Sequence, residues 1–138
     1  MKARVTWAGE RTFLGESGTG NTVTLGTTER DGKRIAPSAM ELLLIGTGGC
    51  SAWDVVNILE KGRQRVEDCV VDLDADRADT DPAVFTRIHM HFVVKGRGLD
   101  AAKVERAIHL SAEKYCSASA MLCKTAELTH DFEVVELE

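Results

Sequence analysis

One long apolar segment, residues 40–59, constrains the fold of this chain more than any other feature. Pro37 sets a backbone angle suited to a first helical turn, and Lys61-Gly62 places a cation and a glycine where a helix would end. The segment is long enough to suggest a membrane span, but it contains Glu41, Asp54 and three glycines. We therefore expect a buried core helix and no membrane partner.

This helix would be apolar on nearly all sides, so most of its surface must be covered. At 138 residues with 43% hydrophobic side chains, the chain has the size and core of one ordinary domain. A domain this small can rarely cover such a helix with its own sheet, and a second subunit is a natural source of the missing cover. We expect a single domain, residues 1–138, that forms a homodimer.

The amino-terminal part of the chain reads as short strands. Residues 3–7 and 11–14 predict a hairpin with its turn at residues 8–10, and residues 22–26 predict a third strand. Residues 29–35 are polar and basic, and we expect them to form a loop leading into the apolar helix.

A period of two begins at Val66 and predicts a longer hairpin. Acidic residues alternate with apolar ones in the first strand, and basic residues alternate with apolar ones in the second, residues 84–94. The connecting turn contains Asp81-Pro82. Pairing would set the acidic outer face against the basic one, which is worth roughly 0.2 to 1 kcal/mol per pair.

The last third of the chain predicts two helices and a strand. Asp100 is a suitable N-cap for a helix whose apolar stripe is Val104, Ala107, Ile108, Ser111 and Tyr115. The helical pattern is reset near Cys116, with Ser117 as a possible cap for a short helix through Thr125, and a half-buried strand follows. The expected order is β-β-β-α-β-β-α-α-β, an α+β fold.

Charge and composition exclude several kinds of partner. The net charge of -5 and the absence of a Lys/Arg cluster argue against nucleic acid. The amino terminus lacks the apolar region of a signal peptide, which indicates a cytoplasmic protein. The four cysteines form no CxxC pair, and His89 and His91 share a strand face without a third ligand, so we expect no metal and no cofactor.

Two cysteines lie in contexts that suggest chemistry. Cys50 follows Gly46-Thr47-Gly48-Gly49, where glycines that weaken a helix could let a substrate or another helix approach; an inert core thiol is the alternative. Cys116 precedes a helix start, where unpaired N–H groups favour a thiolate. If Cys50 reacted with a peroxide, a nearby second thiol could condense with its sulfenic acid to a disulfide. Cys69 and Cys123 are expected to be inert packing thiols.

The segments APSAMELLLIGTGGCSAWDVVNIL and EKYCSASAML resemble the two cysteine motifs of the OsmC/Ohr family, and FLGES and LSAEKYC are similar to its YhfA-like branch. The resemblance covers essentially the whole chain. It implies an OsmC-like fold, an intertwined homodimer with central buried helices, and reduction of organic hydroperoxides in oxidative or osmotic stress defence. On this basis Cys50 is the peroxidatic thiol and Cys116 the resolving thiol.

The family also holds the reactive thiolate with a glutamate and an arginine. Met40 stands at the glutamate's position, and Glu41, one step along the helix, would point about 100° away. The candidates from the preceding loop are Arg30, which matches the arginine's distance from the motif in one family branch, and Arg34. The alternative for both is a solvated charged loop.

Two functions fit these residues. In the first, the chain is a cysteine-based peroxidase that is restored by a dithiol reductant. In the second, it is a non-catalytic protein that binds a small hydrophobic ligand at the dimer interface. Met40 in place of a carboxylate favours binding, and the two thiols in matching contexts favour the enzyme.

Overall fold

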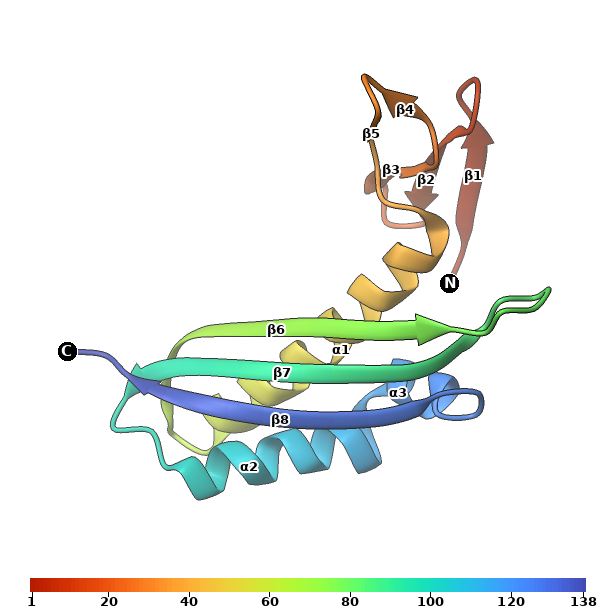
Figure 1. Ribbon diagram of the computed structural model, residues 1–138. Coiled ribbons are helices and arrows are strands. Elements are labelled where there is room, and N and C mark those ends of the chain that lie inside the picture. Colours follow the sequence, from red (N-terminus) through yellow and green to blue (C-terminus); the bar gives the residue numbers. More distant parts are fainter. The chain divides into compact units, whose positions relative to one another are not determined.

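The computed structural model describes residues 1–138 and has an α+β fold (Figure 1). Its elements are β1 (Ala3–Trp7), β2 (Thr12–Ser17), β3 (Thr22–Gly26), β4 (Glu29–Arg30), β5 (Lys33–Arg34), α1 (Ala39–Lys61), β6 (Arg65–Arg77), β7 (Phe85–Arg97), α2 (Ala101–Leu110), the π-helical turn η1 (Ser111–Tyr115), α3 (Ser117–Leu122) and β8 (Glu127–Glu136). The predicted order is confirmed with two additions. The basic loop contains a small hairpin, β4–β5, and a π-helical turn separates the last two helices.

Contacts divide the chain into two compact units, residues 1–44 and residues 45–138. The first unit contains the antiparallel sheet β1-β2-β3, with Ala3 opposite Ser17 and Thr12 opposite Gly26, and the separate β4–β5 hairpin. β2 extends three residues beyond the predicted strand. That both units form one domain stays a prediction.

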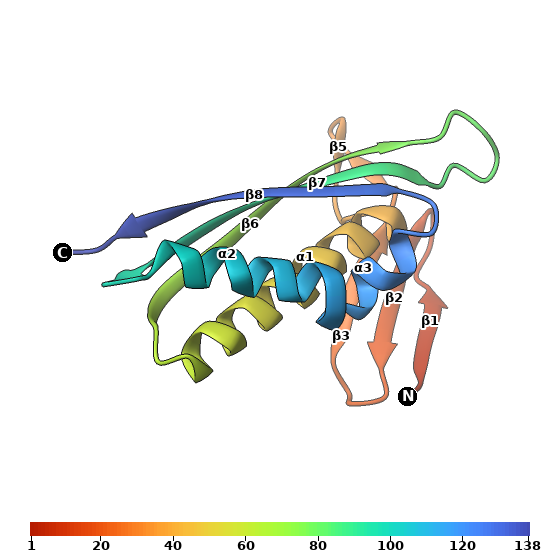
Figure 2. The same cartoon turned by 90° about the horizontal axis from the view of Figure 1, so that it is seen from below.

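The second unit is a three-stranded sheet in the order β6-β7-β8, with helices packed on one face (Figures 1 and 2). β6 and β7 are antiparallel, whereas β8 lies parallel to β7, so the connection between β7 and β8 crosses over through α2 and α3. The core between sheet and helices consists of side chains that are at most 2% exposed: Val55 and Leu59 from α1, Ile88, Met90, Phe92 and Val94 from β7, and Val104, Ala107 and Ile108 from α2.

The charged faces of the long hairpin pair as the alternation predicts. Asp74 lies opposite His89 and Asp76 opposite Arg87. Arg87 binds both aspartates, with its Nη2 2.8 Å from Asp74 and its Nε 2.7 Å from Asp76. The histidines of β7 hydrogen-bond to Asp131 of β8 rather than to the acidic face of β6.

Helix α1 has the expected extent but ends differently. The residue with left-handed backbone is Arg63, at φ 61°, rather than Gly62, and the Gln64 N–H closes the end by donating to the Leu59 carbonyl at 2.8 Å. The helix is long and apolar enough to cross a membrane by length and composition, and 28% of its most apolar window is buried. Val55 and Leu59 make α1 a core helix, as predicted.

The transition from α2 to α3 departs from regular helical geometry. Asp100 caps α2 as expected, accepting the Ala102 N–H at 2.9 Å. In the turn η1 a hydrogen bond spans five residues instead of the four of an α-helix: the Cys116 N–H donates to the Ser111 carbonyl. This shift takes Tyr115 off the buried stripe, and Tyr115 is 50% exposed, contrary to prediction.

Candidate functional site

Glu41 caps the start of α1. Its carboxylate accepts the Ser38 N–H at 3.0 Å, and the Ser38 hydroxyl accepts the Glu41 N–H at 3.1 Å, which is a reciprocal capping box. The hydrogen bond from the Ser38 backbone, followed by the one from its side chain, lowers the pKa of Glu41. The spacing Ser-x-x-Glu at residues 38–41 was the available sequence signal for this capping box. A thiolate-supporting role for Glu41 stays a prediction.

Both candidate arginines lie on the β4–β5 hairpin and form ion pairs within residues 1–44. Arg30 binds the Glu10 carboxylate with two nitrogens, at 2.8 and 3.2 Å, and this hydrogen bonding raises the pKa of Arg30. The Arg34 Nε lies 3.4 Å from the Glu29 carboxylate. All four side chains are exposed. Their contribution to a reactive thiol stays a prediction.

Cys50 lies in the middle of α1, is half-buried and is reduced. Gly48, two residues before Cys50, permits close packing of α1 against the sheet. A Cβ added to Gly48 would lie 2.6 Å from the Leu73 Cδ1 atom of β6. The glycine-rich segment therefore brings α1 close to β6. This observation favours helix–sheet packing as one reason for the glycines.

Cys116 is buried, 3% exposed, and occupies the N-cap of α3 in an extended conformation with φ -74° and ψ 103°. The prediction of a helix-start cysteine is confirmed, with Cys116 rather than Ser117 as the cap. Its sulfur accepts the Ser119 hydroxyl at 3.2 Å and the Ser119 N–H at 3.4 Å. α3 ends at Leu122, three residues earlier than expected.

The two cysteines predicted to react are brought together. The side chain of Cys50 lies near enough to the Cys116 thiol to raise its pKa, although the two residues are 66 positions apart in the sequence. Burial is the largest cause of the raised pKa of Cys116, and the two hydrogen bonds from Ser119 act in the opposite direction. A disulfide between the two cysteines would require their sulfurs to approach to about 2 Å.

A buried polar chain links the segments that carry the two cysteines. Ser111 donates to the Asp54 carboxylate at 2.9 Å, and its hydroxyl lies 3.0 Å from that of Ser51. Ser51 follows Cys50 on α1, and the Ser111 carbonyl accepts the Cys116 N–H. This chain of hydrogen bonds was not predicted, although a serine and an aspartate inside an apolar helix were a signal for it.

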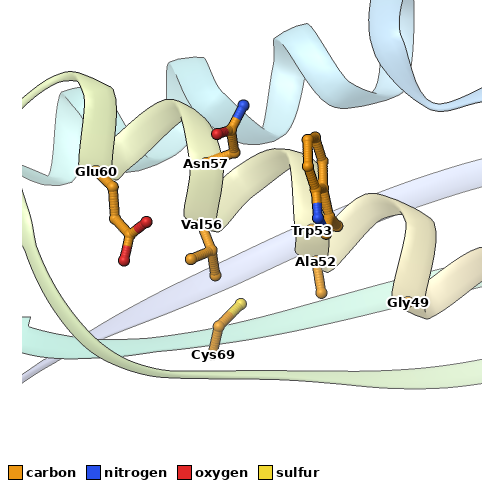
Figure 3. A pocket seen from close by; sticks show the side chains of 7 residues that line it. All are labelled: Gly49, Ala52, Trp53, Val56, Asn57, Glu60 and Cys69. Carbon is orange, nitrogen blue, oxygen red and sulfur yellow. The ribbon is translucent and has the colours of Figure 1, made fainter.

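The remaining cysteines differ in environment. Cys69 of β6 is half-buried and points toward α1 at a cavity of about 410 Å³, lined by Gly49, Ala52, Trp53, Val56, Asn57 and Glu60 (Figure 3). Burial, followed by Asp68, raises its pKa, which disfavours the reactive thiolate. Cys123 is exposed and donates to the Ala120 carbonyl at 3.2 Å, so the prediction of a packing thiol at this position is wrong. Cys123 is the C-cap residue of α3.

His89 and His91 share one oxygen of Asp131, at 2.9 and 2.8 Å, on the outer face of the sheet. The hydrogen bond to Asp131 raises the pKa of His91, and the bonds from His91 and His89 lower the pKa of Asp131. No group of three or more His, Cys, Asp or Glu side chains is arranged to hold a metal ion. The cluster is an ion-pair network across β7 and β8.

Replacing the Asp131 carboxylate should change how the free energy of unfolding depends on pH. A raised histidine pKa stabilises the fold fully below about pH 6.5 and loses that contribution as pH rises through the folded value; a lowered aspartate pKa stabilises it above about pH 3.8. We expect Asp131→Asn to lose most stability between these limits and progressively less above them. Urea unfolding at pH 5.5 and pH 9 measures this, with exposed Asp79→Asn as the control. An equal loss at both pH values would contradict the ion-pair account.

The fold and the two thiols define an α+β protein in which a cysteine of the long helix α1 lies near a cysteine that caps α3. The family model described as OsmC-like protein matches residues 30–131. The chain is 51% identical over 135 residues to "Protein YhfA" of Escherichia coli strain K12, covering 98% of both chains. The chain belongs to the OsmC family.

Solved structures agree with this assignment. The crystal structure of a hypothetical protein from Aquifex aeolicus VF5 is 32% identical with a TM-score of 0.87, covering 99% of this chain and 97% of that one. The organic hydroperoxide resistance protein OhrB of Bacillus subtilis is 15% identical with a TM-score of 0.62, covering 96% and 98%. The second likeness shows the fold alone.

Proposed function

We propose that this protein is a thiol-dependent peroxidase that reduces organic hydroperoxides in oxidative or osmotic stress defence. The observation that carries the proposal is the proximity of Cys50 to the buried Cys116 thiol, which caps α3, in a chain of the OsmC family. The naming of a structural neighbour for organic hydroperoxide resistance supports the choice of substrate. Cys69, with its raised pKa, and Cys123, on the surface, lack a comparable thiol partner.

The reaction needs only the two thiols and an external dithiol. The Cys50 thiolate attacks one peroxide oxygen, the O–O bond breaks, and the leaving alkoxide takes a proton to become the alcohol. Cys50 is then a sulfenic acid. The Cys116 thiolate attacks its sulfur, an S–S bond forms, and hydroxide leaves and is protonated to water. An external dithiol reduces the disulfide and is itself oxidised. Arg30 and Arg34 are the proposed cationic supports of the first thiolate, with Glu41.

Oxidation with stoichiometric peroxide tests the proposal directly. The reduced wild type should form a Cys50–Cys116 disulfide rapidly, and faster with cumene hydroperoxide than with hydrogen peroxide because burial of the apolar body adds binding energy. Disulfide mapping by mass spectrometry identifies the bond among the four cysteines. Slow oxidation spread over all four cysteines, with no preference for the organic peroxide, would refute the enzyme proposal.

The exposed apolar surface of α1 supports a homodimer. Ile45 is 58% exposed and Trp53 is 68% exposed, although both lie on the most apolar helix of the chain. Large apolar side chains gathered on one helix are costly to leave in water and are well suited to an interface. We propose that a second copy covers this surface and that the dimer acts in the cytoplasm.

The cavity beside Cys69 favours a second candidate, a non-catalytic protein that binds a small hydrophobic ligand. Its volume of about 410 Å³ lies within the usual range of ligand pockets, and Ala52, Trp53 and Val56 give it an apolar wall (Figure 3). This candidate predicts the slow, unselective oxidation described above. It also predicts that apolar ligands change the fluorescence of Trp53.

A further inference from the structure

Ser119 is a buried serine whose hydroxyl and backbone N–H both donate to the Cys116 sulfur. Its side chain is 2% exposed, and its hydroxyl donates a single hydrogen bond, to the Cys116 sulfur at 3.2 Å. The backbone N–H of the same residue donates to the same sulfur at 3.4 Å. Sulfur in a neutral thiol is a weak acceptor, whereas a thiolate is a strong one. Two donors from one residue therefore suit the charged form of Cys116.

The rest of the surroundings opposes that charged form. Cys116 is 3% exposed, so water contributes little to its solvation, and burial raises its pKa. The Ser119 hydrogen bonds lower this pKa, and the nearby Cys50 raises it. In this pocket the thiolate depends on Ser119, because Ser119 supplies the hydrogen-bond donors that its sulfur accepts.

We propose that Ser119 is a catalytic residue of disulfide formation, in which its hydroxyl and backbone N–H hold the Cys116 sulfur as the thiolate that attacks oxidised Cys50. The inference rests on the proposed peroxidase function and assigns a residue to its second step. Cys116 gives its proton to water, its sulfur bonds to the sulfur of the Cys50 sulfenic acid, and the S–O bond breaks. The departing hydroxide takes up a proton and leaves as water.

The proposal predicts that loss of the Ser119 hydroxyl slows disulfide formation at neutral pH and that this effect disappears at high pH. Each unit by which a thiol pKa rises lowers the thiolate fraction about tenfold at neutral pH, while the thiolate becomes about threefold more nucleophilic, a net loss of about threefold. Above the pKa the fraction no longer falls, so a variant with a higher pKa should react as fast as the wild type or faster. A merely structural defect would slow the step at every pH.

The experiment follows formation of the Cys50–Cys116 disulfide after one equivalent of cumene hydroperoxide, by quenching and mass spectrometry from pH 6 to pH 10. We expect Ser119→Ala to form it about three- to tenfold more slowly at pH 7, to converge with the wild type at high pH, and to accumulate more Cys50 sulfinic acid. Ser119→Thr should restore the rate, since threonine keeps both the hydroxyl and the backbone N–H that donate to the Cys116 sulfur.

Ser117→Ala is the matched control, because Ser117 is an exposed serine in the first turn of the same helix. Alkylation of Cys116 by iodoacetamide as a function of pH, in a Cys50→Ser background, measures the same thiolate without any peroxide. Ser119→Ala should move this profile to higher pH. An unmoved profile, or wild-type disulfide formation at every pH, would overturn the role of Ser119 alone. A wild type that forms no disulfide would overturn the peroxidase proposal, and the role with it.

Discussion

A Cys50→Ser variant is expected to lose cumene hydroperoxide reduction by on the order of 10³-fold or more. The sulfur that attacks the O–O bond is absent, and the serine hydroxyl stays protonated at neutral pH, so no comparable nucleophile remains at this position. Cys116→Ser should instead keep the first oxidation and stop there: Cys50 would accumulate as sulfenic and then sulfinic acid. Peroxide consumption with dithiothreitol as reductant, together with intact mass, measures both outcomes.

Cys69→Ser and Cys123→Ser serve as controls, because neither thiol contacts the Cys50–Cys116 pair in the proposed chemistry. Both should keep wild-type turnover. Activity of Cys50→Ser within tenfold of the wild type would show that another group attacks the peroxide. If dithiothreitol resolves the Cys116→Ser sulfenic acid directly, turnover persists but no intramolecular disulfide forms, and mass mapping separates the two cases.

Most of the fold could be predicted from periodicity because its strands and helices are long and half-buried. Strands β6 and β7 alternate over 13 residues each, so their faces and register follow from the side chains. The hairpin β4–β5 has two residues per strand, too few to show a period. Its turn, Asp31-Gly32, with φ 54° and 74°, is a dipeptide typical of tight hairpins and was the available signal.

The candidate site could be predicted only in part. Motif and chemistry identified the two cysteines, but a π-helical turn precedes Cys116 and sets it one residue off the regular path of α2. Sequence periodicity contains no reliable signal for such a turn, since it is fixed by tertiary contacts. The bond from Ser111 to Asp54 is one of these contacts, and it joins residues 57 positions apart.

Gly96, near the end of β7, is expected to be essential for stability because the paired strand β6 approaches it closely. Gly96 lies opposite the irregular start of β6, and a Cβ there would collide with the carbonyl oxygen of Arg65 and lie 3.0 Å from the Leu99 Cδ1 atom. The Arg65 carbonyl belongs to the backbone of β6, which is paired with β7, so it cannot move without disturbing the hydrogen bonds between these two strands. We expect Gly96→Ala to cost about 3 kcal/mol or more.

Gly48→Ala is the informative comparison, because the same added methyl group meets a different kind of atom. At Gly48 the nearest atom is the end of the Leu73 side chain, at 2.6 Å, which can change rotamer, and alanine improves helix propensity by about 1 kcal/mol. We expect Gly48→Ala to stay within about 1 kcal/mol of the wild type. Urea unfolding followed by circular dichroism measures both variants. Equal losses would mean that β6 yields as readily as a side chain, and that the sheet is not the rigid surface on which α1 and its cysteine are positioned.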